Sequence, residues 1–199
     1  MIARMSKNVT SYFVARGIVS EEDFEAYAYS FEITISSATG FLALAALALA
    51  SKTVRYSALY LLGFIPLRLI AGGYHAKSHL RCFLILMSSY SAFLGLLSSL
   101  PAGSMLPAIV LAAASVALIA AFAPQPDANK PIEDWEAIRF KRLSRIAAVA
   151  YAAAICAASI LVPDNRIGLS LALGVFAASS ALPASAIRSA LQSKKKSSI

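Results

Sequence analysis

Residues 104–123 read SMLPAIVLAAASVALIAAFA, twenty residues without a charged side chain. At about 1.5 Å per residue, a helix of this length crosses a hydrocarbon layer of about 30 Å. Five further runs are mostly apolar and of similar length, at roughly 33–51, 54–71, 83–100, 146–162 and 167–187. Such runs are typical of transmembrane helices. The sequence therefore predicts an all-α, polytopic integral membrane protein with about six transmembrane helices.

The overall composition supports this fold class. Of the 199 residues 59% are hydrophobic and only 14% are charged, and the mean hydropathy is +0.70. A soluble domain carries about 25% charged residues. Two cysteines, Cys82 and Cys156, do not make a disulfide framework. The polar N-terminus predicts no cleavable signal peptide, and we expect one membrane-embedded domain over 1–199.

Three polar segments flank the predicted spans, and we assign them to an interfacial helix, a cytoplasmic loop and a basic tail: 1–32, 124–145 and 188–199. In the first segment Ser20 suits a helix N-cap, and the acidic residues after it suit a first turn. Apolar side chains then recur at helical spacing, at Phe24, Tyr27, Ala28 and Phe31. This pattern predicts an N-terminal amphipathic helix at the membrane surface that leads into the first span.

The distribution of basic residues predicts the orientation. With six spans and a cytoplasmic N-terminus, 15 of the 18 lysines and arginines lie inside, and only Lys52, Arg55 and Arg166 lie outside. Positive residues accumulate on the cytoplasmic side of membrane proteins. We therefore expect a multi-pass protein of the cell membrane with both termini and the loop over 68–82 in the cytoplasm. The net charge of +8 follows from this bias and does not indicate nucleic-acid binding.

One stretch between two spans concentrates the reactive side chains. Residues 66–82 read PLRLIAGGYHAKSHLRC and hold both histidines and one of the two cysteines. A thiolate is a nucleophile, and an imidazole can accept the thiol proton. Basic neighbours, Arg68, Lys77 and Arg81, add positive potential that favours a thiolate. Cys82 is thus the candidate nucleophile, with His75 or His79 as its base.

Spacing separates the two histidines only in part. His75 and Cys82 would lie about 10.5 Å apart along a straight helix, too far for a hydrogen bond. A break at Gly72-Gly73 would allow His75 to fold back. His79 stands three residues before Cys82 and could contact it within one helix. From the residues alone, His79 is slightly favoured.

Other interpretations of this stretch stay open at the level of the residues. His75, His79 and Cys82 form H-x3-H-x2-C, which suits zinc and a zinc-dependent membrane peptidase, although no fourth ligand is evident. A basic juxtamembrane loop without catalytic residues is a second alternative. A non-enzymatic transporter or a regulatory partner of a sensor kinase is a third, but no acidic residue lies deep in a predicted span to couple ions.

Two motifs resemble those of a known family. Arg68-x3-Gly72-Gly73-Tyr74-His75-Ala76, followed by Cys82, resembles the signature of the AgrB (accessory gene regulator B) family. Ala123-Pro124, followed by Lys130-Pro131-Ile132, is similar to the proline- and lysine-containing loop after the fourth span of that family. The family consists of membrane cysteine endopeptidases of Gram-positive bacteria that process a short quorum-sensing propeptide.

The resemblance implies a catalytic pair of His75 and Cys82, with Arg68, Gly72 and Gly73 in supporting roles. It thereby sets aside the slight preference for His79. It implies cleavage through a thioester on the cysteine, cyclisation of the peptide to a thiolactone or lactone autoinducer, and no cofactor or metal. The expected partners are a short AgrD-like propeptide and the lipid bilayer; a homodimer is left open. Ser78 departs from the threonine found in many members.

Overall fold

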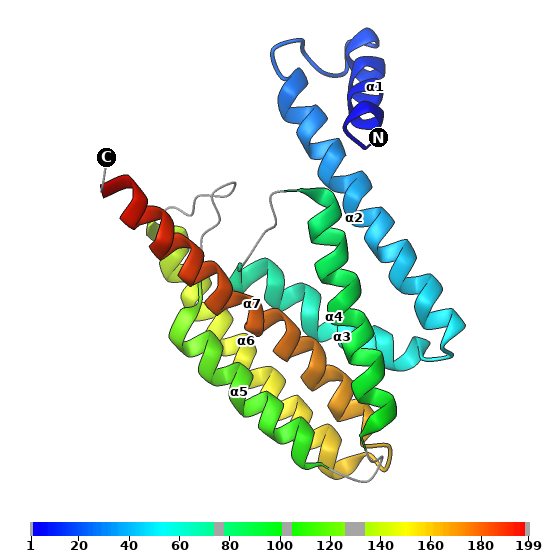
Figure 1. Cartoon of the computed structure of the whole chain (residues 1–199), viewed down its shortest axis with the longest axis vertical. Helices are drawn as coiled ribbons and strands as arrows, with labels where there is room; N and C mark the ends of the chain where they lie inside the picture. The colour runs from blue at the N-terminus through cyan, green and yellow to red at the C-terminus, as the bar shows by residue number, and fades with distance from the viewer. Residues whose placement is uncertain (1, 74–77, 101–104, 126–133, 198–199) are drawn as a thin grey trace. The chain divides into compact units, whose positions relative to one another are not determined.

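The all-α prediction is confirmed by a computed structural model that describes residues 2–73, 78–100, 105–125 and 134–197, without the side chains of 79, 134 and 188–197. These described residues form seven helices (Figure 1). In chain order they are α1 (Ile2–Ala15), α2 (Phe24–Ala50), α3 (Val54–Ala71), α4 (His79–Ser99), α5 (Leu106–Phe122), α6 (Asp134–Leu161) and α7 (Arg166–Ser197).

The predicted spans correspond to helices α2 to α7. Among the described residues, five helices are long and apolar enough to cross a membrane, namely α2, α3, α4, α6 and α7. The run over 104–123 forms the shorter apolar helix α5 of 17 residues. Helix α3 coincides with the predicted span 54–71, and only 51–53 separate it from α2. The predicted polytopic membrane protein is therefore confirmed.

The N-terminal segment differs from the prediction in its helix boundaries. The prediction placed one helix in residues 1–32, starting near Ser20. The structure has a separate helix before it, α1, over Ile2–Ala15. Gly17 adopts φ +68° and donates its N–H to the Val14 carbonyl at 2.8 Å, which ends this helix. Ser20 accepts a hydrogen bond from the Asp23 N–H in a turn, and α2 begins only at Phe24 and continues as the first span. The apolar residues predicted at helical spacing from Phe24 to Phe31 thus lie in α2, and α1 is an additional helix within 1–32.

Two further boundaries lie outside the predicted spans. Helix α6 begins at Asp134, so the second half of the predicted loop 124–145 is helical. Helix α7 continues to Ser197, so most of the predicted basic tail 188–199 is helical too. Charged residues such as Glu, Lys and Arg are good helix formers. Hydropathy marks only the part of a helix that matches the lipid, and these helices extend beyond it.

The chain divides into two compact units. The first comprises Met1–Lys52 with Lys77–Ser88, and the second comprises Thr53–Ala76 with Ser89–Ile199. In the first unit α1 packs along the start of α2. Gly40 of α2 lies beside Leu86 of α4, where an added Cβ would stand 3.1 Å from the leucine Cδ2.

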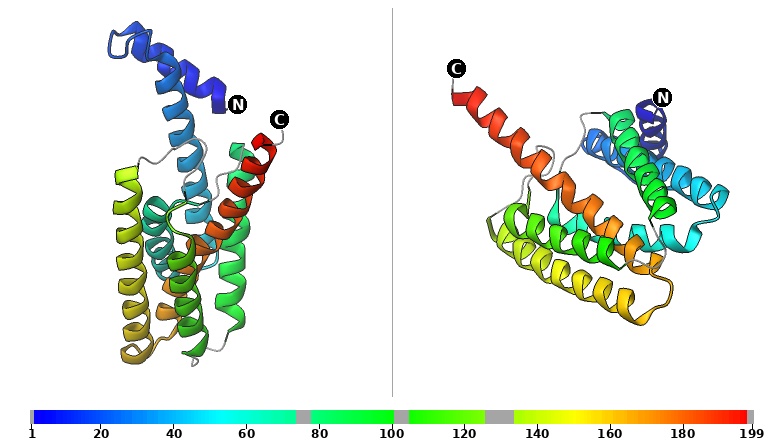
Figure 2. Two further views of the ribbon diagram at one scale, coloured as in Figure 1. Left: turned by 90° about the vertical axis from the view of Figure 1, so that its left-hand side faces the viewer. Right: turned by 60° about the horizontal axis from the view of Figure 1, so that its bottom comes forward.

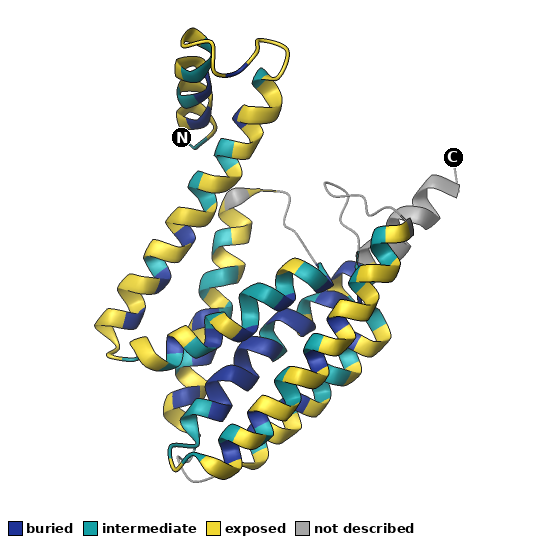
Figure 3. Ribbon diagram, turned by 180° about the vertical axis from the view of Figure 1, so that it is seen from behind, coloured by how far each residue is buried: buried dark blue, intermediate teal, exposed yellow. Residues whose placement is uncertain are grey.

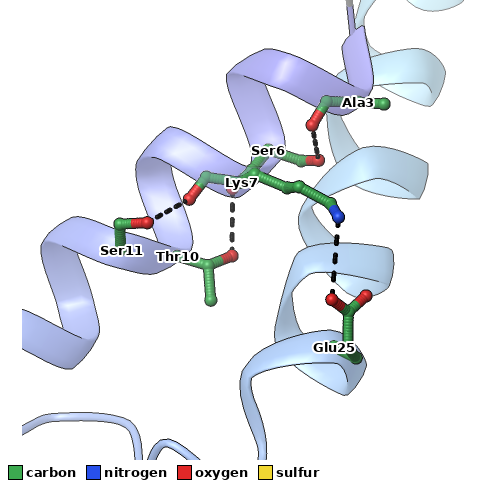
Figure 4. Close-up of polar contacts among 6 residues, drawn as sticks. All are labelled: Ala3, Ser6, Lys7, Thr10, Ser11 and Glu25. Atoms are coloured by element: carbon green, nitrogen blue, oxygen red, sulfur yellow. Dashed lines mark hydrogen bonds and ion pairs between the residues drawn. The ribbon is translucent and has the colours of Figure 1, made fainter.

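Small polar residues line the contact face of α1. Ser6 and Thr10 are buried, and each hydroxyl donates to a carbonyl of its own helix, at 3.0 and 2.9 Å (Figure 4). Small side chains that satisfy their own hydroxyls allow two helices to approach closely. At the exposed edge Lys7 stands 3.6 Å from the carboxylate of Glu25. An exposed pair of this kind contributes little to stability, so packing holds this helix pair together.

In the second unit α7 is the central helix. Helices α3, α5 and α6 all pack against it, and α5, α6 and α7 lie side by side in Figure 2. In the most apolar segment of α7, 61% of the residues are buried, whereas in the corresponding segment of α2 only 17% are buried. Figure 3 shows this contrast, since the first half of α7 is largely dark blue. An added Cβ on Gly174 would collide with the Tyr60 carbonyl, so α3 and α7 approach at backbone distance.

Buried hydroxyl pairs join α3 to the second half of α4. The Tyr90 hydroxyl lies 2.6 Å from Ser57 Oγ, and the Tyr60 hydroxyl lies 2.8 Å from Ser89 Oγ. Ser57 already donates its hydrogen to the Thr53 carbonyl, so Tyr90 is the donor in the first pair. Both tyrosines are almost fully buried. Helix α3, which leads to the predicted site, is thus held by α4 on one side and by α7 on another.

Candidate active site

Cys82 lies at the beginning of α4 with an exposed, free thiol. Its N–H donates to the Ser78 carbonyl at 3.0 Å, and the N–H of Arg81 lies 3.4 Å from Ser78 Oγ. Ser78 therefore occupies the N-cap position of the helix. The first turn of a helix has backbone N–H groups without helical partners and carries the positive end of the dipole, which suits an anion. The predicted nucleophile is accessible and stands close to this positive end.

Helix α3 ends where the sequence predicted a break. Its last residue is Ala71, and the next two, Gly72 and Gly73, adopt φ values of +73° and +117°. Side chains rarely tolerate such values. Space is also lacking, because a Cβ on Gly72 would collide with the Gln125 carbonyl and one on Gly73 with Arg68 Nη1. Both positions therefore require glycine for two separate reasons.

Three consecutive carbonyls at the end of α3 accept hydrogen bonds from different parts of the second unit. Arg68 Nη1 donates to the Gly72 carbonyl at 3.0 Å, which gives this predicted supporting residue a definite partner. The Gln125 N–H donates to the Ala71 carbonyl, also at 3.0 Å. Ser144 Oγ of α6 lies 3.3 Å from the Ile70 carbonyl, but donates mainly to its own helix at 2.7 Å. The end of α3 is thus held by hydrogen bonds from three different residues.

The two sequence motifs meet at Gly72. Gly72 and Gln125 form an isolated parallel bridge, so the segment after Ala123-Pro124 lies against the glycine pair. Gln125 was missed in the sequence because it is an ordinary polar residue after a proline. The only available signal was the position of Pro124 next to it. This contact unites motifs that are far apart in the chain.

The predicted site residues are described to different extents. Arg68, Gly72 and Gly73 come together at the end of α3, and Cys82 lies in α4. His75 lies outside the described residues, as do Lys130, Pro131 and Ile132 of the second motif. His79 is the first residue of α4, and its side chain is not described. The pairing of His75 with Cys82 therefore stays a prediction.

Comparison with known proteins gives one match. The family model of accessory gene regulator B matches residues 6–182, which run from α1 into the second half of α7. Comparison with curated proteins and with solved structures gave no match. The matched range includes both motifs and all the predicted site residues.

Proposed function

Since the chain belongs to the accessory gene regulator B (AgrB) family, which is involved in processing quorum-sensing propeptides, we propose that it is a membrane cysteine endopeptidase for such a propeptide. The observation that carries the proposal is the exposed thiol of Cys82 at the start of α4, shortly after the glycine break that ends α3. A nucleophile needs this accessibility. Because α3 ends at Ala71, the separation of about 10.5 Å that one straight helix would impose on His75 and Cys82 does not apply.

The proposed reaction uses Cys82 as nucleophile and His75 as general base. His75 accepts the thiol proton while the sulfur attacks a peptide carbonyl in the propeptide. The C–N bond breaks, His75 returns the proton to the departing amine, and the N-terminal part stays bound as a thioester. A cysteine or serine within this part then attacks the thioester, which closes a thiolactone or lactone ring and frees Cys82. The thioester keeps the acyl group activated, so ring closure needs no ATP.

Trapping the acyl-enzyme tests this proposal. Purified protein mixed with a synthetic propeptide that lacks the internal cysteine or serine should gain the mass of the N-terminal fragment minus one water. Hydroxylamine should release the fragment, because it cleaves thioesters readily. Cys156→Ala serves as the matched control and should form the same adduct. Cleavage without an adduct on Cys82 would contradict the proposal.

We further propose that both termini and the loop over 68–82 lie in the cytoplasm, as the basic residues predict. Cys82 provides a test because its thiol is exposed. In a Cys156→Ala background, a membrane-impermeant maleimide should leave Cys82 unlabelled in intact cells and label it in inverted vesicles. Labelling in intact cells would place the loop outside and overturn this orientation.

A further inference from the structure

Gln125 connects the C-terminal ends of two helices. Its backbone N–H donates to the Ala71 carbonyl at 3.0 Å, and its side-chain Nε2 donates to the Phe122 carbonyl at 2.7 Å. Ala71 ends α3 and Phe122 ends α5. The carbonyls in the last turn of a helix accept no hydrogen bond from an N–H of the same helix, so they need donors from elsewhere. One residue therefore caps both helices, and we call this contact the α3–α5 junction.

Gly72 also lies in close contact with Gln125 at the α3–α5 junction. Gly72 bridges to Gln125 in parallel, and there is no room for a Cβ on Gly72 against the Gln125 carbonyl. Arg68 Nη1 also donates to the Gly72 carbonyl at 3.0 Å. Ala71 and Gly73 are buried. The backbone at the end of α3 is thus fixed by contacts that leave little freedom for it to shift.

This fixed point lies directly before the proposed general base. His75 follows Gly73 by two residues, so the backbone that leads to His75 starts from the junction. We propose that Gln125 is a positioning residue, which holds the glycine pair and thereby the start of the chain segment that carries His75. The inference rests on the proposed function. It also gives the Ala123-Pro124 motif a role, since this motif places Gln125 against α3.

The expected effect on catalysis exceeds the expected effect on stability. A nucleophile and its base must approach to about 3 Å, and a displacement of about 1 Å can cost about a hundredfold in rate. Substrate binding need not change, because neither Gln125 nor Gly72 is proposed to contact the propeptide. Disturbing the junction should therefore lower kcat and leave KM nearly constant.

A matched pair of glycine variants tests the inference. Gly72→Ala places a methyl group against the Gln125 carbonyl, whereas Gly95→Ala of α4 meets nothing within 4 Å. With the full-length protein and a synthetic propeptide, Gly72→Ala should lower kcat at least about tenfold and change KM by less than about twofold. Gly95→Ala should retain the kcat of the parent protein. Alkylation of Cys82 by a maleimide, measured with Cys156→Ala in the background, should proceed at the parent rate in both.

Variants of Gln125 make the test independent of any misfolding by Gly72→Ala. Gln125→Ala removes the bond to the Phe122 carbonyl but keeps the backbone N–H, so kcat should fall about threefold to tenfold. Gln125→Glu puts an acceptor in place of that donor and should lower kcat further. A general loss of folded protein would also lower the apparent kcat at constant KM, so kcat is calculated from the amount of folded protein measured in each preparation.

Each outcome separates the inference from the proposed function. Parent-like kcat in both Gly72→Ala and Gln125→Glu would overturn the inference. A rise in KM at constant kcat would also overturn it, because the segment would then bind substrate. In the same assay Cys82→Ala reports on the proposed function alone. If it cleaves like the parent protein, the proposed function fails, whatever the junction variants do.

Discussion

Cys82→Ala is expected to lower the rate of propeptide cleavage by at least about 10³-fold. The alanine has no atom that can form the proposed thioester, and loss of a catalytic nucleophile costs about 10⁶-fold in well-studied proteases. Cys82 is exposed, so its side chain contributes little to the stability of the fold. The variant should therefore remain folded. Cleavage of a tagged propeptide co-expressed with each variant, quantified by mass spectrometry, measures the effect.

Cys156→Ala is the matched control for this experiment. Cys156 is half-buried within α6, and replacing it removes the other thiol of the chain. We expect cleavage within about twofold of the parent protein, since the substitution removes one heavy atom, the sulfur, from a half-buried position. Cys82→Ala that still cleaves at a tenth of the parent rate would rule out covalent catalysis by this residue.

His75→Ala is expected to lower the cleavage rate by about 10²- to 10⁴-fold, the range usual for a general acid–base group. His79→Ala should change it by less than about threefold, although His79 stands closer to Cys82 in the chain. The contrast follows from the family to which the chain belongs and from the break at Gly72, which ends α3 before His75. Steady-state cleavage by the two purified variants, with equal amounts of folded protein, provides the comparison.

The reverse ranking would assign the base to His79. That residue begins α4, and its three-residue spacing from Cys82 permits a contact within the helix. Equal losses in both variants, together with inhibition by a chelator and recovery with zinc, would instead indicate a metal site formed by His75, His79 and Cys82. Loss from His75→Ala alone, insensitive to chelators, is the result that our proposal requires.

The extent to which the sequence predicted the fold depends on what ends each helix. The approximate bounds predicted for helix α3, 54–71, agree with the structure because the polar segment 51–53 and the glycines Gly72-Gly73 enclose it. The start of α6 and the end of α7 were not, because those turns are polar and hydropathy detects only the portion that matches lipid. Helix α1 was missed for a similar reason, since its contact face contains serine and threonine instead of large apolar residues.

The candidate site was likewise predicted only in part. The conformational freedom of glycine was sufficient to predict the break after Ala71. The contact with Gln125 was not predictable, because its bond to Ala71 uses the backbone N–H, which every residue except proline possesses. The side chain gives no sign of that bond, and the two partners are far apart in the sequence. Only the three-dimensional structure brings the second motif to the first.

The hydroxyl pairs between α3 and α4 have a consequence for helix association. A serine in a lipid-embedded helix can donate to a carbonyl of its own helix, as Ser57 does to Thr53. The longer tyrosine places its hydroxyl away from its own backbone, and Tyr60 and Tyr90 find their described partners on the neighbouring helix. Without these contacts each tyrosine hydroxyl would lack its described partner, and an unpaired hydroxyl in an apolar environment is costly. The two hydroxyl pairs therefore favour association of α3 with the second half of α4 in the membrane.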